Sequence, residues 1–176
     1  MTEAKETHAV YAGSFDPPTL GHEWMIDEAL KLFSRLTIVI ARNPAKKYTF
    51  SYEQRSGMLM SVPDGVLTKY AQHMNIRIAT INNELLVDWA AKVTPPVTHL
   101  VRGVRNLEDF EYERAMRNVN ADRNPAMSTV FLVPLRHLCE ISSSFVKGLV
   151  GLSGWESLVG KYVSRSVLQA LKLNAP

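Results

Sequence analysis

Residues 8–22 read HAVYAGSFDPPTLGH, a short apolar run followed by a loop rich in glycine and proline. The first five residues, 8–12, are almost continuously apolar, as expected of a strand that helices cover on both faces. Gly13 allows the chain to leave that strand close to a ligand. Gly21 removes a side chain at the start of the next helix, where free backbone N–H groups attract anions. His22 then falls in the first helical turn, so the pattern predicts a strand, a ligand-binding loop and a helix in this order.

The rest of the chain repeats this alternation of short apolar runs and segments of helical period. Such alternation is typical of β-α-β units around a parallel sheet, so we predict an α/β fold. The strands are expected at residues 8–12, 36–41, 77–81, 99–101 and 129–133. The helices are expected around residues 25–33, from a capping box of Ser51 and Gln54 onward, and near 84–93, 109–119, 142–150 and 155–171.

The composition fits a single domain that covers residues 1–176. With 46% hydrophobic and 21% charged residues, the chain is neither disordered nor of low complexity. A single cysteine, Cys139, cannot form an internal disulfide, and no apolar run approaches the ~20 residues that span a bilayer. We therefore expect a cytoplasmic protein that does not enter a membrane. The net charge of +3 is small and its basic residues are mostly scattered, so we expect no nucleic-acid partner.

Three further polar segments each follow a predicted strand. Residues 41–47 read ARNPAKK, residues 101–105 read VRGVR, and residues 141–144 read ISSS after a short loop. The carboxyl ends of parallel strands share one edge of a sheet, and open α/β sheets bind their ligands at that edge. Arginine offers a planar fork and lysine a mobile point charge, which both suit phosphate groups. The sequence therefore predicts that these segments and the loop before His22 surround one site for phosphate-bearing ligands.

In these four ordered motifs the sequence resembles the nucleotidyltransferases of the (H/T)-x-G-H superfamily. With Thr19 at the first position of that signature, it is most similar to the phosphopantetheine adenylyltransferase family, since related nicotinate-mononucleotide adenylyltransferases and many cytidylyltransferases usually carry His there. The motifs span residues 13–147, most of the chain. The resemblance implies a Rossmann-like, doubly wound sheet of five parallel strands in the order 3-2-1-4-5, with helices on both faces and a C-terminal helix.

The resemblance also implies roles for individual residues. His22 is expected to stabilise the transition state and Lys46 to orient the attacking group. The residues expected to contact ATP are Ser14, Phe15, His22, Gly103, Val104, Arg105, Glu113, Leu138, Cys139, Glu140, Ile141, Ser142, Ser143 and Ser144. The residues expected to contact the second substrate are Ser14, Lys46, Leu86 and Arg102. The family often has an aromatic residue shortly before the serine run; this chain has Leu138 there, so we expect backbone contacts from that loop.

The implied reaction transfers AMP from ATP to the phosphate of 4′-phosphopantetheine and gives dephospho-CoA and pyrophosphate. Because the acceptor is already an anion, the protein mainly has to hold two repelling groups in line and stabilise the transition-state charge. No acidic cluster with metal-site spacing stands in the sequence, so no residue is expected to be a metal ligand and Mg²⁺ is expected to arrive with ATP. The resemblance further implies a homohexamer, and a crevice that also takes dephospho-CoA and CoA.

Three other functions remain open from the sequence. The same fold and ATP site could serve another acceptor such as a nicotinate nucleotide, although Thr19, Lys46 and Arg102 speak against it. A regulatory nucleotide-binding module without turnover would have no need of these cations and His22. A nucleic-acid-binding module would need basic and aromatic residues interleaved, and the sequence has no such segment.

Overall fold

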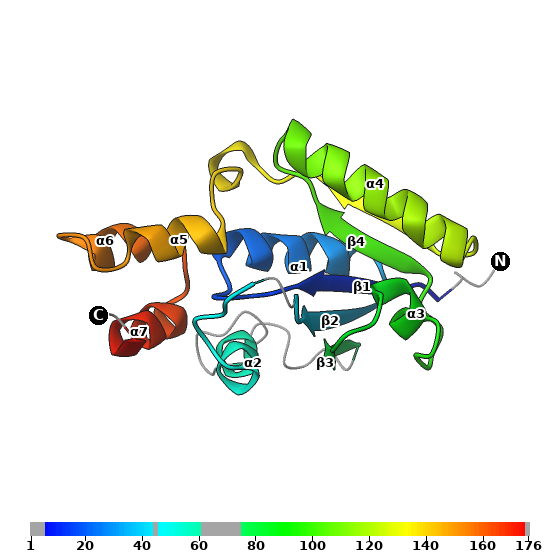
Figure 1. Cartoon of the computed structure of the whole chain (residues 1–176), viewed down its shortest axis with the longest axis horizontal. Helices are drawn as coiled ribbons and strands as arrows, with labels where there is room; N and C mark the ends of the chain where they lie inside the picture. Colours follow the sequence, from blue (N-terminus) through cyan, green and yellow to red (C-terminus); the bar gives the residue numbers. More distant parts are fainter. Residues whose placement is uncertain (1–5, 44–45, 61–74, 175–176) are drawn as a thin grey trace.

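Five parallel strands form one sheet in the order β3-β2-β1-β4-β5 (Figure 1). The structure is a computed structural model that describes residues 6–43, 46–60 and 75–174. The strands are β1 His8–Gly13, β2 Arg35–Ala41, β3 Ile76–Ile81, β4 His99–Gly103 and β5 Ser128–Leu132. The predicted strand order is confirmed, and each predicted strand matches an observed one to within two residues at either end. The central position of β1, between β2 and β4, places the loop that follows it in the middle of the carboxyl edge.

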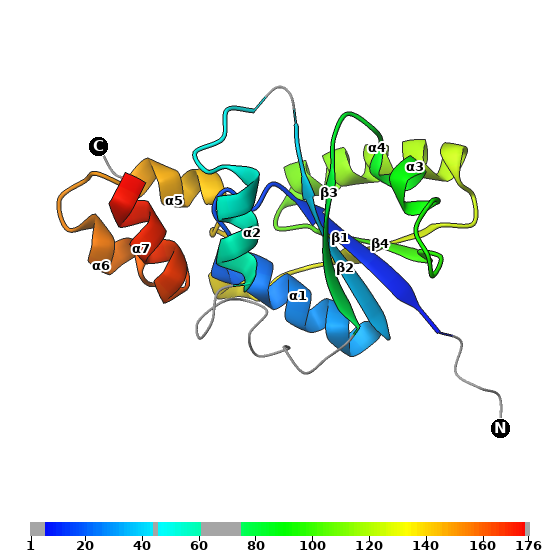
Figure 2. The same cartoon turned by 90° about the horizontal axis from the view of Figure 1, so that it is seen from below.

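Helices cover both faces of the sheet, which confirms the doubly wound arrangement. They are α1 Leu20–Leu32, α2 Tyr52–Met60, α3 Leu86–Ala90, α4 Leu107–Arg123, α5 Ser143–Leu149, α6 Trp155–Val159 and α7 Arg165–Asn174, with a short 3-10 helix η2 at Arg136–Leu138. The pair α1 and α2 lies on one face, and the pair α3 and α4 lies on the other (Figure 2). Successive side chains of a strand point to opposite faces. In β1, accordingly, Tyr11 packs with Ile26 of α1, whereas Val10 packs with Val87 of α3.

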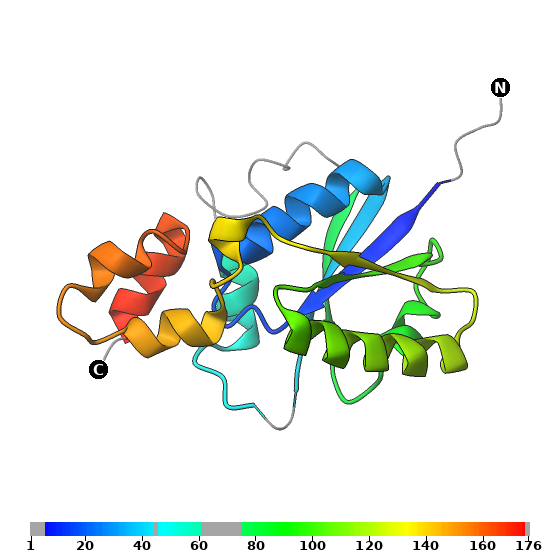
Figure 3. The ribbon, with the colours of Figure 1, turned by 90° about the horizontal axis from the view of Figure 1, so that it is seen from above.

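A third apolar cluster lies beyond the carboxyl edge of the sheet, where α5, α6 and α7 gather beside α2 (Figure 3). Its buried members are Phe50, Met58, Val146, Trp155, Val159, Val163, Val167 and Leu171. The cluster anchors the C-terminal helices next to the motif loops, so these helices close one side of the site. In the described part of the chain, no helix is long and apolar enough to cross a membrane.

The prediction of one continuous helix over residues 155–171 is wrong, because the chain breaks between α6 and α7. Gly160 ends α6, and the carbonyl of Tyr162 accepts a hydrogen bond from the backbone N–H of Leu20 at 2.9 Å instead of from a later helical turn. A straight helix of that length would run on for roughly 25 Å. The break instead turns Val167 back, so that both short helices bury their apolar sides in the same cluster.

Capping side chains set the starts of two helices. The predicted capping box is confirmed, since the Ser51 N–H donates to Gln54 Oε1 at 2.8 Å and the Gln54 N–H donates to Ser51 Oγ at 3.3 Å. In α4, Asn106 Oδ1 accepts from the N–H of Asp109 at 2.8 Å, which begins the helix two residues before the predicted start. The helix predicted at residues 84–93 is shorter in the structure, where only Leu86–Ala90 is helical.

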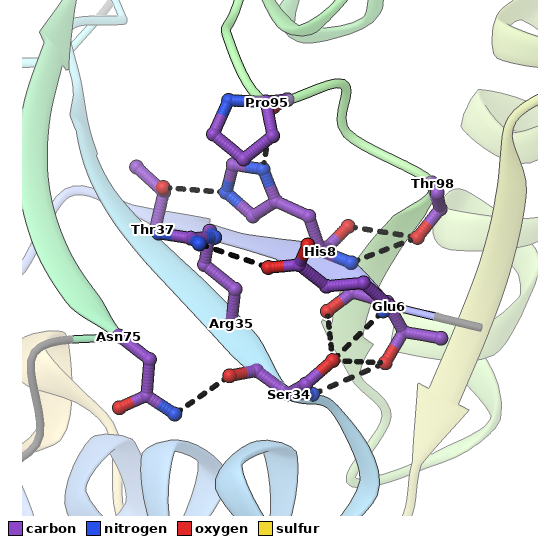
Figure 4. Close-up of polar contacts among 9 residues, drawn as sticks. Glu6, His8, Ser34, Arg35, Thr37, Asn75, Pro95 and Thr98 are labelled. Carbon is purple, nitrogen blue, oxygen red and sulfur yellow. Dashed lines mark hydrogen bonds and ion pairs between the residues drawn. The ribbon is translucent and has the colours of Figure 1, made fainter. Parts of the chain in front are cut away.

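Side-chain hydrogen bonds close the amino edge of the sheet, opposite the motif loops (Figure 4). His8 donates from Nδ1 to the Pro95 carbonyl at 2.9 Å, and its Nε2 lies 2.8 Å from the hydroxyl of Thr37. The Thr98 hydroxyl bonds to the backbone of His8, and Asn75 donates to the Ser34 carbonyl at 2.6 Å. These bonds join the starts of neighbouring strands to each other and to the loop before β4.

Candidate active site

A cleft of about 450 Å³ lies at the carboxyl edge of the sheet. It is lined by Tyr11, Ala12, Gly13, Ser14, Asp16, Thr19, Gly21, His22, Met25, Lys46, Lys47, Tyr48, Arg102, Gly103, Arg105, Glu113, Pro134, Leu138, Ile141, Ser142, Ser143, Ser144 and Lys147. The cleft thus brings together residues from all four sequence motifs. The strand ends of β1 and β4, which pair directly, form its floor.

His22 is held in one orientation by the residue that begins its helix. The N–H of Thr19 donates to His22 Nδ1 at 3.0 Å, and the Thr19 hydroxyl lies 2.8 Å from the same nitrogen. Because Nδ1 accepts the backbone N–H, the proton of the neutral ring stands on Nε2. Phe15 supports the other side of the ring, with the two ring centroids 5.0 Å apart. His22 therefore offers one N–H donor in a fixed direction.

Burial decides the charge of His22. Desolvation, with a smaller contribution from the nearby Arg105, lowers the pKa of His22 from 6.5 to about 4. The imidazole is therefore neutral at pH 7. A neutral donor can stabilise negative charge that develops on a phosphoryl oxygen without itself titrating during the reaction.

The low pKa of His22 predicts an acid-dependent loss of stability. Between pH 7 and pH 5 the unfolded chain, whose His22 titrates near 6.5, gains a proton that the folded chain with a pKa of about 4 does not take. The free energy of unfolding should therefore fall by about 2 kcal/mol over that range. Urea unfolding at a series of pH values measures this free energy. In His22→Gln the free energy of unfolding should depend less steeply on pH. An unchanged dependence on pH would contradict the lowered pKa of His22.

Arg102 and Glu113 form an ion pair at the carboxyl end of β4. Arg102 donates from Nε to Glu113 Oε2 at 2.7 Å and from Nη2 to Oε1 at 2.5 Å, and its Nη1 donates to the Ala12 carbonyl at 3.0 Å. The Glu113 side chain is only 11% exposed. Three of the five guanidinium N–H groups are thus engaged, and the remaining ones can meet a ligand. The pair fixes the plane of the guanidinium over the end of β1.

Arg105 is oriented by its own carboxylate partner, Asp109. The Arg105 side chain donates from Nε to Asp109 Oδ2 at 2.7 Å and from Nη2 to Oδ1 at 3.0 Å. This contact, strengthened by charge, raises the pKa of Arg105 and lowers that of Asp109. Gly103, between the two arginines, packs closely on α1: a Cβ there would stand 3.2 Å from the sulfur of Met25, so a larger residue would require Met25 to shift. The close contact keeps the end of β4 against α1.

The serine run begins α5 on the opposite side of the cleft. Ser142 Oγ accepts from the N–H of Phe145 at 3.1 Å and caps the helix. The Ser143 hydroxyl donates to the Pro17 carbonyl at 2.8 Å, which joins α5 to the loop after β1. Ser144 lines the cleft beside them. The hydroxyls of Ser142 and Ser143 are therefore used to build the wall of the site.

Some of the predicted contact residues do not line the cleft. Phe15 and Val104 are buried in the core, and Cys139 and Glu140 lie in the loop between η2 and α5. Leu86 packs on the apolar cluster between the sheet and α3. Their proposed contacts stay predictions.

The sequence motifs do not reveal a second ion pair, in which the carboxylate is buried and the ammonium partly exposed. Asp16 and Lys147 line the cleft and meet at 2.7 Å. Both residues fall within or next to the motifs, but the contact joins positions 131 residues apart in the chain. Nothing in the sequence alone indicates that these two side chains meet.

Comparison with known proteins agrees with this geometry. The cytidylyltransferase-like family model matches residues 10–148. The chain is 44% identical over 163 residues to a phosphopantetheine adenylyltransferase of Neisseria meningitidis serogroup C, covering 93% of this chain and 91% of the relative. It is 42% identical to a phosphopantetheine adenylyltransferase of Chromobacterium violaceum, covering 93% and 94%.

Solved structures share the fold at low sequence identity. The Plasmodium falciparum nicotinic acid mononucleotide adenylyltransferase complexed with NaAD matches with a TM-score of 0.62 at 17% identity, covering 96% of this chain and 95% of that one. This likeness shows the fold, whereas the family follows from the sequence relatives. The chain is a nucleotidyltransferase of the cytidylyltransferase-like family and, within it, belongs to the phosphopantetheine adenylyltransferase family.

Proposed function

We propose that the protein transfers AMP from ATP to 4′-phosphopantetheine and releases dephospho-CoA and pyrophosphate, the penultimate step of coenzyme A biosynthesis. One observation carries the proposal: His22, Lys46, Arg102 and the serine run surround a single cleft at the carboxyl edge of the sheet. The names of relatives at 42–44% identity support the choice of acceptor. The proposal treats residues 1–176 as one nucleotidyltransferase domain.

In this mechanism the acceptor phosphate attacks the α-phosphorus of ATP in line, and no covalent enzyme intermediate forms. The attacking oxygen is already anionic, so rate enhancement comes from alignment and from stabilisation of charge on the α-phosphoryl oxygens. His22 donates its Nε2 proton as a hydrogen bond to one of these oxygens. Lys46 neutralises and orients the attacking phosphate.

Arg102 holds the acceptor phosphate through the guanidinium N–H groups that Glu113 and Ala12 leave open. Because the ion pair with Glu113 fixes the guanidinium plane, little side-chain entropy is lost when the phosphate binds. Ser14 lies between the two substrates, and Leu86 contacts the pantetheine arm in this proposal.

ATP lies against the β4 end and the serine run. The proposed nucleotide contacts are Ser14, Phe15, His22, Gly103, Val104, Arg105, Glu113, Leu138, Cys139, Glu140, Ile141, Ser142, Ser143 and Ser144. Arg105 is held by Asp109 facing the cleft, and this supports its assignment to the phosphates of ATP.

A divalent metal, which we take to be Mg²⁺, accompanies ATP. In the described residues no group of three or more His, Cys, Asp or Glu side chains is placed to hold a metal ion. Asp16 and Glu113, the acidic side chains of the cleft wall, both have cationic partners. This donor set fits a metal whose ligands come mainly from ATP phosphates and water. Such an ion would neutralise charge on the phosphates.

The assembly and location of the enzyme are further parts of the proposal. We propose a homohexamer in the cytoplasm, with dephospho-CoA and CoA binding in the same cleft and with no nucleic-acid or membrane partner. The motif resemblance is the basis for the hexamer and for CoA, and the scattered charge is the basis for excluding nucleic acid.

The products and their stereochemistry test the proposal. With ATP and 4′-phosphopantetheine, dephospho-CoA and pyrophosphate should appear in equal amounts. With ATP made chiral by sulfur at the α-phosphorus, one in-line displacement should invert the configuration. Formation of ADP, or retention of configuration, would contradict the proposed transfer.

A further inference from the structure

The carboxylate of Asp16 is buried at the back of the cleft, with only 3% of its side chain exposed. It accepts hydrogen bonds from the backbone N–H of Thr49 at 3.0 and 3.1 Å and from that of Phe50 at 2.9 Å. The ammonium of Lys147 completes its surroundings at 2.7 Å. Two backbone donors and one cation thus satisfy a charge that would otherwise be costly to bury.

These contacts join three segments that carry different parts of the site. Asp16 belongs to the loop between β1 and α1, which leads to His22. Thr49 and Phe50 end the Lys46 segment, which comprises residues 46–50. Lys147 belongs to α5, which begins with the serine run. A single carboxylate therefore links the Lys46 segment to the other two.

Among the described residues, Arg55 of α2 gives the Lys46 segment a second attachment to the loop after β1. Arg55 of α2 is buried, donates from Nη1 to the Ser14 carbonyl at 2.7 Å, and lies 4.4 Å from the ring centroid of Tyr48. Helix α5, by contrast, is held by the bond from Ser143 to Pro17 and by the buried Val146. Loss of the Asp16 charge should displace the Lys46 segment more than the serine run, because two of the three partners of Asp16, Thr49 and Phe50, belong to that segment.

We infer that Asp16 is a positioning residue for acceptor-phosphate binding, acting through the backbone of Thr49 and Phe50 and through the ion pair with Lys147. Through these contacts Asp16 places the Lys46 ammonium where it can bind the attacking phosphate. His22 then faces the α-phosphoryl group of ATP. This inference rests on the proposed function, because it needs a phosphate acceptor opposite ATP. The carboxylate is required: an Asn there offers one acceptor oxygen and turns its NH₂ group toward donors.

The test compares Asp16→Asn, Lys147→Gln and Lys147→Arg with the parent protein. Asp16→Asn and Lys147→Gln should raise the KM for 4′-phosphopantetheine about tenfold or more, because a displaced Lys46 ammonium loses its charge-assisted contact with the acceptor phosphate. The Kd for ATP, measured by calorimetry, should stay within about threefold. Lys147→Arg retains the cation and should restore most of the acceptor affinity. In the double variant Asp16→Asn/Lys147→Gln, the rise in acceptor KM should be smaller than the two single effects combined, since each change breaks the same ion pair.

A distant ion pair provides the control. Asp88→Asn breaks the exposed contact between Asp88 and Arg123, 2.8 Å apart on α3 and α4, and should change neither KM. Lys147 is 30% exposed on its side chain, so Lys147→Gln should fold even if Asp16→Asn does not. The inference would be overturned if Lys147→Gln left the KM for 4′-phosphopantetheine unchanged. It would also be overturned if the affinities for ATP and for the acceptor fell equally. If the parent itself did not use 4′-phosphopantetheine, the proposed function would fail instead.

Discussion

Replacing His22 with alanine is expected to lower kcat by about 10²- to 10³-fold while the Kd for ATP changes by less than about threefold. The expectation follows from the fixed Nε2–H donor, which Thr19 holds through Nδ1. A donor that is aimed at charge developing in the transition state contributes to rate far more than to ground-state binding. Single-turnover kinetics at saturating substrates, together with calorimetry for ATP, measure both quantities.

Two variants control this result. Thr19→Val removes the hydroxyl beside Nδ1 but retains the backbone donor, so kcat should fall by a smaller factor than in His22→Ala. His99→Gln replaces an imidazole at the start of β4, at the other edge of the sheet, and should leave kcat unchanged. Abolished ATP binding with normal turnover at saturation in His22→Ala would show that His22 serves binding instead of the chemical step.

Arg102→Lys is expected to lower kcat/KM for 4′-phosphopantetheine by about 10- to 100-fold, with a smaller effect on the Kd for ATP. The charge is retained, but a lysine cannot replace three guanidinium bonds to Glu113 and Ala12 and still reach a phosphate. Because Glu113 is nearly buried, the free energy of unfolding should also fall, by about 1–3 kcal/mol. Steady-state kinetics and urea unfolding measure the two effects.

The conservative change is preferable to Arg102→Ala, which would leave the Glu113 carboxylate buried without its partner and destabilise the fold. Arg123→Lys provides the matched control, since Arg123 pairs with Asp88 at the surface and does not line the cleft. Equal losses in the use of ATP and of the acceptor by Arg102→Lys would contradict the assignment of Arg102 to the acceptor phosphate.

The sheet could be predicted because its strands are short, apolar and separated by segments of helical period. Burial of a parallel sheet on both faces imposes this pattern, so even the short β4 is visible in the sequence. The strand order came from family resemblance, and the structure confirms it. The predicted strands and their order together place the four motifs at one edge of the sheet, and the cleft lies at that edge.

The remaining features depend on contacts between distant residues. The break at Gly160 depends on the bond from Leu20 to the Tyr162 carbonyl, while the apolar period continues across it. The pairs of Arg102 with Glu113 and of Asp16 with Lys147 depend on how loops approach one another in space. Charge patterns in the sequence show that cations and carboxylates are present, but not which of them meet.

Pyrophosphate release from ATP, with 4′-phosphopantetheine, nicotinate mononucleotide and a cytidylyltransferase acceptor assayed in parallel, tests the proposed activity most directly. Thr19, Lys46 and Arg102 all line the cleft, as the choice of a pantetheine acceptor requires. We expect turnover with 4′-phosphopantetheine and none above background with the other two acceptors. Turnover only with a non-pantetheine acceptor would contradict it.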